Sequence, residues 1–533
     1  MFDGRKLPDG KIIETDVCIV GAGASGITLA LEFLNAPFNV ALVESGGLKF
    51  NHKTQLLYRG ENIGRPYFDI EFTKQRYFGG ATNKWYGRCR PFDNIDFEKR
   101  HWVQYSGWPF GKDELDPYYS KAHAVCQLGA YNYDPEYWED WEKRSFPKNN
   151  TGIETKIFQF SPPTRFGQKY LGKILKAKNI KTFLNANAVS ISLEPNGRKV
   201  ASIKFSTLNG KVFKVSAKIF ILAASPLENT RLLLVSNNIH KNGIGNQHDL
   251  VGRFFMEHPH IFCGVLASTI PPENASYYKV LDYNSSVGNQ GTVGALGIAE
   301  DMMRREQLLN ASAFFVWRKD YKVDDRYFSK GALSLTHVMD TLNHTNAPGL
   351  NFLRNLKTAL RHGDKTFNIM AKRMKGMIHP KNWIAIRAQI ETVPNPHSRV
   401  TLSKKKDNLG INKLTLDWRL TQQDLNSFRK FQETLFNFLQ IKGLNMRVFN
   451  HELDEAGWPV TMISGKHHMG TTRMHSDPKK GVVDPNCRVH GVANLFIAGS
   501  SIFPTSGQAN PMLTIVALAI RLAENVKRII CIS

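Results

Sequence analysis

Near the amino end, the order of apolar and polar residues predicts a strand, a helix and a second strand in close succession. A short apolar run at 16–20 is followed by the turn Gly21-Ala-Gly-Ala-Ser-Gly26 and then by apolar residues at helical spacing from 29 to 34. A second apolar run, 40–43, ends at Glu44. A strand, a G-x-G-x-x-G turn, a helix, a strand and an acid about 20 residues further on form the βαβ unit typical of dinucleotide binding.

Each position of this unit has a physical reason. Gly21 permits the tight turn, Gly23 lets the backbone approach a pyrophosphate, and Gly26 allows close packing of helix against strand. The positive end of the helix dipole would face the phosphates. Glu44 would accept hydrogen bonds from ribose hydroxyls, and its charge disfavours the 2′-phosphate of NADP. The motif alone leaves FAD and NAD open.

A second glycine-rich loop spans 77–87, where aromatic residues flank two glycines and a polar step. Gly79 and Gly80 let backbone N–H groups reach a phosphate or a ring edge. Thr82 and Asn83 are the polar candidates of the same loop. A glycine-rich surface loop explains the pattern equally well.

Further along, the pattern changes to short strands. Alternating residues broken by Asn-Gly turns predict β-strands from 182 to 224, and the run 227–236 predicts a helix. Between 254 and 465, strand and helix patterns mix less regularly. We find no internal repeat and no low-complexity linker.

The carboxyl end has the densest concentration of reactive and glycine-rich motifs. An H-H-M-G-T run begins at His467, and a predicted strand at 495–499 follows it. Asn510 and Pro511 then stand in the order of N-cap and first helical residue. The final predicted helix therefore begins with its positive end just after a glycine-bearing turn, a suitable place for anionic charge on a cofactor.

Length and composition restrict the class of protein. The 533 residues exceed what one hydrophobic core usually supports, so we expect two domains. Hydrophobic residues make up 42% and charged residues 22%, as in globular proteins. The longest apolar stretch, 512–520, is far short of the ~20 residues of a membrane span. No apolar segment follows the amino-terminal charges, and the six cysteines lack ligand spacing. We therefore expect a cytoplasmic protein without a zinc site or a disulfide framework.

Charge is the unusual quantity, because 70 Lys and Arg against 46 Asp and Glu leave a net charge of +24. Such a field attracts anions, and part of it is clustered at 354–413. There, apolar and basic residues alternate at helical spacing, which is compatible with a helix on an anionic membrane surface. A solvated basic face explains the cluster as well. Nucleic acid is not an expected partner, because no recognition motif accompanies the charge.

Taken together, these motifs resemble the glucose–methanol–choline (GMC) family of FAD-dependent oxidoreductases. The motifs occur in family order: VGAGASG with VESGG, FGGATNKW, AASPLENTRLLL, EHPH, and H-x-x-G-T with NPMLT. The SPLENTRLLL and VGRFFMEHP forms are most similar to the pyranose-oxidase and gluconate/fructose-dehydrogenase branch. The resemblance covers most of the chain and is weakest in its middle.

The resemblance implies an α/β fold with a Rossmann-like FAD-binding domain assembled from both chain ends. Residues 1–253 would form its first part, including a cofactor-covering loop near 76–110, and residues 466–533 its second, catalytic part. The segment 254–465 would form a substrate domain with an antiparallel sheet over the flavin. The resemblance also favours FAD as the cofactor.

The family's chemistry is oxidation of an alcohol to a carbonyl, with hydride passing to flavin N5. Carried onto this chain, His467 would be the general base and Asn510 would donate a hydrogen bond to the same substrate oxygen. A base near pKa 6.5 suits this task. His468 is a rival base, and Asn510 could serve only as a helix cap. The expected substrate is a sugar, amino sugar, polyol or other alcohol.

The candidate cofactor-binding residues come from four stretches of the chain. They are Gly21, Gly23, Gly26, Glu44, Gly79, Gly80, Thr82, Asn83, Val189, Gly499, Pro511 and Met512. Relatives that tether FAD covalently carry a histidine where this chain has Lys84, directly before Trp85. The sequence therefore predicts FAD that is bound without a covalent link.

Several alternatives remain open at this stage. Oxygen, a quinone or a protein carrier could accept the electrons, so the enzyme could be an oxidase or a dehydrogenase. A peripheral membrane dehydrogenase that passes electrons to a carrier fits the basic cluster. A non-redox lyase on the same fold is the third reading.

Overall fold

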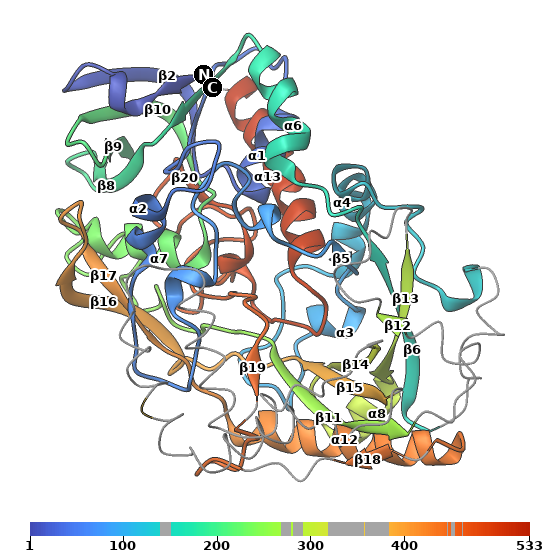
Figure 1. Cartoon of the computed structure of the whole chain (residues 1–533). Helices are drawn as coiled ribbons and strands as arrows, with labels where there is room; N and C mark the ends of the chain where they lie inside the picture. Colours follow the sequence, from blue (N-terminus) through green and yellow to red (C-terminus); the bar gives the residue numbers. More distant parts are fainter. Residues whose placement is uncertain are drawn as a thin grey trace.

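The computed structural model contains three sheets with helices packed around them (Figure 1). It describes residues 1–138, 151–267, 279–280, 291–317, 357, 383–444, 446–448, 453–460 and 462–532. The first part of the basic cluster predicted at 354–413, up to residue 382 and apart from residue 357, lies outside the described residues. No helix in the described part of the chain is long and apolar enough to cross a bilayer.

The first sheet has the βαβ unit at its centre. Its strands run in the order β1-β7-β3-β2-β10-β9-β8, and β20 pairs with β10 at the end of β10. All pairs between β1 and β10 and the pair β10–β20 are parallel, whereas β10–β9 and β9–β8 are antiparallel. The bounds are β1 Phe2–Asp3, β2 Lys11–Val20, β3 Val40–Val43, β7 Ile180–Leu184, β8 Asn187–Leu193, β9 Val200–Ser206, β10 Val212–Leu222 and β20 Leu495–Ile497.

The second sheet is antiparallel apart from the β12–β14 pair, and it lies in the lower half of Figure 1. Its order is β18-β11-β15-β14-β13-β6-β5, with β12 beside β14 and β19 beside β11. The bounds are β5 Arg88–Cys89, β6 Ile153–Phe160, β11 Pro259–Ala267, β12 Lys279–Val280, β13 Thr292–Ile298, β14 Ala311–Trp317, β15 Trp383–Ile390, β18 Met446–Val448 and β19 Ile463–Ser464. A three-stranded sheet joins β16 Arg399–Lys406, β17 Asn412–Asp417 and β4 Glu61–Asn62.

The predicted α/β class and the antiparallel second sheet are confirmed. Two strands from the first predicted segment, β5 and β6, belong to the second sheet, so that segment contributes to both. The domain limits at 253 and 465 stay a prediction.

Among the described helices, α1, α6 and α7 contact strands of the first sheet, whereas α12 contacts strands of the second. The predicted helix at 227–236 is α7, and the predicted final helix is α13. The bounds are α1 Ala24–Glu32, α2 His52–Gln55, α3 Asn94–Phe97, α4 Lys112–Cys126, α6 Phe166–Lys176, α7 Pro226–Val235, α8 Glu300–Glu306, α12 Gln422–Ile441 and α13 Met512–Ile532.

The two chain ends share one hydrophobic core. Helix α13 contacts α1 and α4, and its residues Leu513, Val516 and Ile520 are fully buried in the same core as Val17 and Ile19 of β2. Burial of several such side chains, each worth about 1.5–3 kcal/mol, ties the carboxyl end to the amino-terminal unit. Strand β20 continues the sheet from the same end of the chain.

The turn after β2 gives a direct test of packing. A Cβ atom added to Gly26 would lie 1.9 Å from the carbonyl oxygen of Gly21, which itself has φ +104°. We expect Gly26→Ala to lower the free energy of unfolding by roughly 2–4 kcal/mol, because helix and turn must separate. Thermal unfolding of the protein measures this change.

Gly23→Ala, three residues earlier, is the matched control. A Cβ atom at Gly23 would meet no atom within 4 Å, and its φ of −82° suits alanine. We expect its midpoint to fall far less, by the equivalent of at most about 1 kcal/mol for a changed helix cap. Equal midpoints for the two variants would contradict the packing role of Gly26.

Candidate active site

A first cleft opens at the carboxyl ends of the parallel strands. The register pairs Val20 with Val43 and with Leu222, and Leu222 with Ile497. The turns after β2, β3, β10 and β20 therefore meet at one edge of the sheet, the usual ligand edge of α/β folds. The cleft holds roughly 1170 Å³ of empty space, open to solvent. Its other wall is the start of α7.

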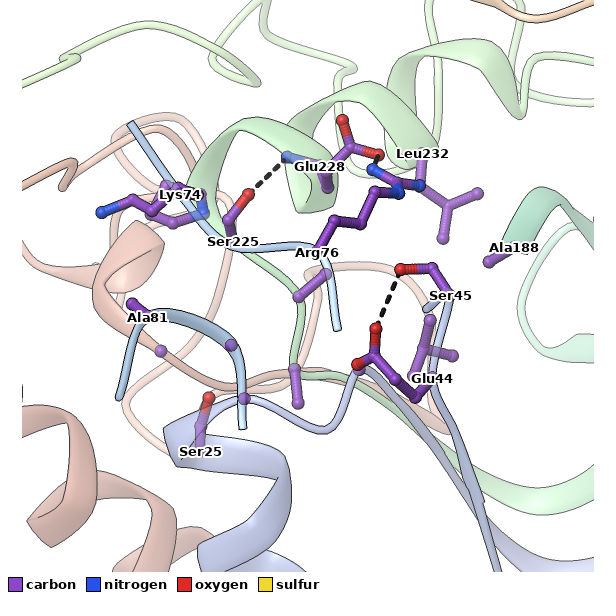
Figure 2. Close-up of a pocket in the computed structure, with 18 of the residues that line it drawn as sticks. Ser25, Glu44, Ser45, Lys74, Arg76, Ala81, Ala188, Ser225, Glu228 and Leu232 are labelled. Carbon is purple, nitrogen blue, oxygen red and sulfur yellow. Dashed lines mark hydrogen bonds and ion pairs between the residues drawn. The ribbon is translucent and has the colours of Figure 1, made fainter. Parts of the chain in front are cut away.

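The first cleft fits a dinucleotide. Gly23 precedes α1 without a side chain, and Ser25 of the first turn lines the cleft, so the N–H end of α1 is accessible to phosphate (Figure 2). Glu44 is held by three donors: Oε2 accepts from the Ala22 N–H at 2.8 Å, and Oε1 accepts from Gly46 N–H at 2.9 Å and Ser45 Oγ at 3.0 Å. The carboxylate keeps lone pairs for ribose hydroxyls.

An ion pair missed by the sequence analysis forms another wall of this cleft. Arg76 reaches Glu228 at the start of α7, with Nη1 2.9 Å from Oε2 (Figure 2). Its guanidinium also lies 4.6 Å from the ring centroid of Tyr58. Arg76 and Glu228 are 152 positions apart in the chain (228 − 76), so no local pattern could have joined them.

The structure separates the candidate cofactor residues into three groups, one of which is Pro511 alone, because it lines only the second cleft. Those that line the first cleft are Gly21, Gly23, Glu44, Gly80, Gly499 and Met512. Those whose side chains or positions lie outside both clefts are Gly26, Gly79, Thr82, Asn83 and Val189.

Among the residues outside both clefts, Thr82 and Asn83 stabilise the loop that carries them. Thr82 donates to the Gly79 carbonyl at 2.6 Å, and Asn83 donates to the Phe78 carbonyl at 2.9 Å, so both side chains stabilise their own loop. Val189 lies at the irregular step of β8, whereas its neighbour Ala188 lines the first cleft.

A second cleft adjoins the first and holds roughly 1310 Å³ of empty space. Both clefts are lined by Lys74, Gln75, Ala81, Ser500, Met512 and Ile515. The second cleft is lined by His467, Asn510 and Pro511, so the two predicted catalytic residues lie beside the candidate dinucleotide cleft. This brings together segments that are more than 400 residues apart, such as Gly23 and His467.

The two predicted catalytic side chains contact each other. Asn510 Nδ2 lies 3.1 Å from His467 Nε2. Arg88 Nε donates to Asn510 Oδ1 at 3.2 Å, and an arginine can only donate, so this contact fixes which end of the amide faces the histidine. Asn510 Nδ2–H must therefore donate to His467 Nε2. The structure begins α13 at Met512, so Asn510 lies two residues before the helix rather than directly before a first helical residue at Pro511, and its oxygen accepts from Arg88.

A third residue fixes the protonation of His467. His258 Nε2 lies 2.9 Å from the Gly507 carbonyl oxygen and 3.2 Å from that of Ser506. Carbonyl oxygens can only accept, so His258 Nε2 carries the proton and, in the neutral ring, Nδ1 has a lone pair. His467 Nδ1 lies 3.0 Å from His258 Nδ1 and must donate to it. His467 Nε2 is thus unprotonated and faces Asn510.

Burial keeps both rings neutral. Desolvation lowers the pKa of His258 to about 4. The pKa of His467 is lowered well below 6.5, first by burial and then by His258, His260 and two nearby cations. The expected value near 6.5 is wrong, because charge on His467 is disfavoured by desolvation and by positive neighbours. At neutral pH, His467 Nε2 is therefore unprotonated and can accept a proton.

The rival base, His468, also lines the second cleft, but its Nε2 carries a proton. It is fully buried, and its Nε2 lies 2.9 Å from the hydroxyl oxygen of Tyr67. Tyr67 donates its own proton to Glu257 Oε2 at 2.5 Å, so His468 Nε2 must donate to Tyr67. His468 Nδ1 is buried without a hydrogen-bond partner. The geometry thus favours His467 over His468.

Glu257 positions both histidines through the backbone. Its Oε1 accepts from the N–H groups of His258 at 2.9 Å and His467 at 2.6 Å. Sequence reasoning used the E-H-P-H run at 257–260 only as a family motif and assigned it no role. The glutamate directly before a histidine in that motif was the sequence signal for this role of Glu257. No sequence signal pointed to the role of Arg88.

The chain is similar to known proteins over nearly its full length. A sequence model described as GMC oxidoreductase matches residues 394–519, which include His467 and Asn510. The fructose dehydrogenase large subunit of Gluconobacter japonicus is 23% identical over 96% of this chain and 98% of its own. The paromamine 6'-oxidase of Streptomyces fradiae is 23% identical over 96% of this chain and 91% of its own.

Solved structures share the fold. The crystal structure of pyridoxine 4-oxidase from Mesorbium loti matches with a TM-score of 0.56 at 16% identity, covering 96% of this chain and 98% of that chain. At this identity the match shows the fold alone. The resemblance to the GMC oxidoreductases is confirmed.

The tautomer of His467 can be measured directly. In protein with ¹⁵N-labelled histidine, we expect His467 to carry its proton on Nδ1 and to stay neutral as the pH falls through 6.5, because its pKa is depressed. In His258→Leu, the acceptor for Nδ1–H is lost, so the Nε2–H tautomer should gain population. Nitrogen chemical shifts report both the tautomer and the charge of the ring. The signals that disappear in His467→Gln are assigned to His467.

His258→Gln is the matched control. A glutamine can accept from His467 Nδ1–H with its oxygen and donate to the Gly507 carbonyl with its nitrogen, as His258 does. We expect this variant to keep the Nδ1–H tautomer. An unchanged tautomer in His258→Leu would show that His258 does not set it.

Proposed function

From this similarity to the GMC oxidoreductases, we propose that the protein is an FAD-dependent oxidoreductase that converts a CH–OH group of a sugar, polyol or other alcohol to a carbonyl. One observation supports the proposal. The acceptor His467 Nε2 and the donor Asn510 Nδ2 lie 3.1 Å apart in a cleft that adjoins the candidate dinucleotide cleft. Fructose dehydrogenase and paromamine 6'-oxidase, two full-length relatives, support a sugar-like substrate.

The first cleft would hold the dinucleotide part of FAD. Gly23 and the start of α1 would receive the pyrophosphate, and Glu44 would bind the ribose. Met512, at the start of α13, lines both clefts and marks the passage from one to the other. When bound, FAD supplies a hydride acceptor at N5.

In the second cleft, the substrate hydroxyl would replace the direct contact between His467 and Asn510. The hydroxyl would donate its proton to His467 Nε2, and its oxygen would accept from Asn510 Nδ2–H. As the carbinol carbon loses its hydride, His467 takes the hydroxyl proton, which leaves a neutral carbonyl. General bases contribute about 10²–10⁴ to rate in such steps.

Two further features of the chain support this role. His258 and the loop carbonyls behind it keep the accepting nitrogen of His467 unprotonated before substrate arrives. The positive end of α13 begins beside the second cleft and stabilises negative charge that develops there.

The proposal predicts that alcohols reduce the bound flavin. In an anaerobic screen of sugars and polyols, we expect the yellow absorption near ~450 nm to bleach with at least one of them. His467→Ala should slow this bleaching by at least about 10², with flavin content unchanged. Two assays on the same protein identify the electron acceptor. Peroxide formed in air marks an oxidase, and turnover only with a quinone marks a dehydrogenase.

A variant of His468 is the control for the neighbouring ring. His468→Gln can still donate to Tyr67 and should keep most of the bleaching rate. A near-normal bleaching rate in His467→Ala would show that His467 is not the base. A protein that binds no flavin would contradict the whole proposal.

We also propose that FAD is bound without a covalent link. Lys84 is exposed and stands directly before Trp85, whose indole donates to the Thr164 carbonyl at 3.0 Å. The ammonium group of lysine offers no imidazole nitrogen for attachment to the flavin. Denaturation followed by filtration should release all of the yellow colour into the filtrate. Colour that stays with the precipitated chain would contradict this prediction.

A further inference from the structure

The turn that joins β16 to β17 forms part of the wall of the first cleft. Residues 407–411 make this turn, in which the Asp407 N–H donates to the Ile411 carbonyl at 2.9 Å. Leu409 and Ile411, both half-buried, line the first cleft. Figure 1 shows the two strands beside α7. Because these strands belong to the third sheet, the turn brings that sheet to the candidate dinucleotide cleft.

A buried arginine of α7 holds this turn in place. Arg231 Nη2 lies 2.6 Å from Asp407 Oδ2, and the two side chains are 5% and 3% exposed. Arg231 also donates from Nε to the Asn412 carbonyl at 2.7 Å and from Nη2 to the Ile411 carbonyl at 3.1 Å. Charge-assisted hydrogen bonds are about twice as strong as neutral ones, so these contacts hold both ends of the turn against α7.

The same arginine contacts a further wall of the cleft. Its Nη1 donates to the Leu57 carbonyl at 3.3 Å and lies 3.7 Å from Glu228 Oε1. Leu57 belongs to the 3-10 helix η2 Leu56–Tyr58, and Tyr58 lines the first cleft. Arg231 therefore connects three walls of one cleft, which come from η2, α7 and the 407–411 turn.

Asp407 also sets the shape of the turn. Its Oδ1 accepts from the N–H of Leu409 at 2.8 Å and from the N–H of Ile411 at 3.2 Å, whereas its Oδ2 contacts Arg231. An aspartate that accepts from N–H groups two and four residues ahead stabilises a turn. One carboxylate thus couples the position of both cleft-lining residues to α7.

The turn lies at one end of the first cleft. Figure 2 shows Leu232, Ser45 and Ala188 at that end and Lys74 at the other. Leu232 directly follows Arg231 on α7, and α7 contacts both β16 and β8, the strand that carries Ala188. The end that the turn covers is therefore the one that begins at Ser45.

This end has the lining expected around a nucleotide base. Ser45 follows Glu44, which would bind the ribose, and the Glu44 carbonyl accepts from the Ala186 N–H at 3.0 Å. A base attached to that ribose would meet aliphatic side chains, namely those of Ala186, Ala188, Leu232, Val235, Leu409 and Ile411. Binding sites for flat ring systems are predominantly lined by such apolar groups.

We propose that the 407–411 turn closes over the adenosine part of bound FAD and that the Arg231–Asp407 ion pair limits the release of FAD. This inference rests on the proposed function, which supplies the identity of the cofactor. For FAD to leave past the turn, Leu409 and Ile411 must move away from α7, and that movement separates two buried charges. Differences in affinity between related complexes arise mostly in the dissociation rate, so the effect should appear there.

The dissociation rate of FAD tests the ion pair. Holoenzyme freed of excess FAD is diluted, and the rise in flavin fluorescence gives the dissociation rate. Asparagine has one oxygen, so at position 407 it can accept from Arg231 or from the turn N–H groups, but it cannot keep both sets. We expect Asp407→Asn to raise the dissociation rate by at least about tenfold. Leu409→Ala leaves the ion pair intact and should raise the rate roughly fivefold, because it removes apolar cover.

Asp417→Asn is the matched control in the same pair of strands. Asp417 ends β17, pairs with the exposed Arg419 and lines neither cleft. We expect this variant to change the dissociation rate by less than about twofold, because exposed ion pairs contribute little.

Amide hydrogen exchange reports closure of the turn without any turnover of substrate. Mass spectrometry compares exchange in peptides that cover 403–414 with and without FAD. We expect bound FAD to slow this exchange in the wild-type protein and to slow it less in Asp407→Asn, because the turn opens more often. Peptides of α12, which contacts the second sheet, are the internal reference.

The outcomes separate this inference from the proposed function. Equal dissociation rates in wild type and Asp407→Asn, or exchange at the turn that does not respond to FAD, would overturn only the inference. Equal loss of protection in α12 and in the turn of Asp407→Asn would show general destabilisation and would overturn it too. A protein that binds FAD but is reduced by no alcohol would contradict the proposed function and leave the role of the turn intact. A protein that binds no FAD would contradict both.

Discussion

The structure of the site depends on a chain of hydrogen bonds whose direction is set at both ends. At one end, Arg88 can only donate, so it fixes the amide of Asn510. At the other, the carbonyls of Ser506 and Gly507 can only accept, so they fix the ring of His258. His467 lies between these two fixed ends and has a single arrangement open to it. His467 Nε2 is kept unprotonated by groups that can only donate or only accept, before any ligand binds.

The fold supplies this chain of hydrogen bonds from four separate segments. Arg88 lies on β5 of the second sheet, and the carbonyls of 506–507 precede α13, which shares the hydrophobic core of the first sheet. Glu257 then joins two of the segments by holding the N–H groups of His258 and His467. The site therefore lies at the junction of both sheets, and movement of either sheet would change the spacing of the pair. The same junction explains why Arg88, His467 and Asn510, which line the second cleft, come from segments that are distant in sequence.

Sequence reasoning was strongest where the structure is local. The βαβ unit could be predicted because strand, turn, helix and acid follow one another within about 30 residues. His467 and Asn510 could be named from family motifs, but their partners could not: His258 and His467 are 209 positions apart, and Arg88 and Asn510 are 422 apart. The pKa of His467 was misjudged for the same reason, since desolvation and neighbouring cations exist only after folding. Thr82 and Asn83 have the composition of ligand-binding residues, yet their side chains hold a turn.

The pairing of β20 with β10 has a consequence for synthesis of the chain. Strand β10 ends at Leu222 and β20 begins at Leu495, so the ribosome must add roughly 270 residues between them. At about 5–20 residues per second, this takes roughly 14–55 s. During that interval the nascent amino-terminal unit lacks both a strand and the helix that covers its apolar surface. A chaperone that shields exposed hydrophobic surface would be needed for just this period, and a message truncated before the last codons would yield a polypeptide with an open core.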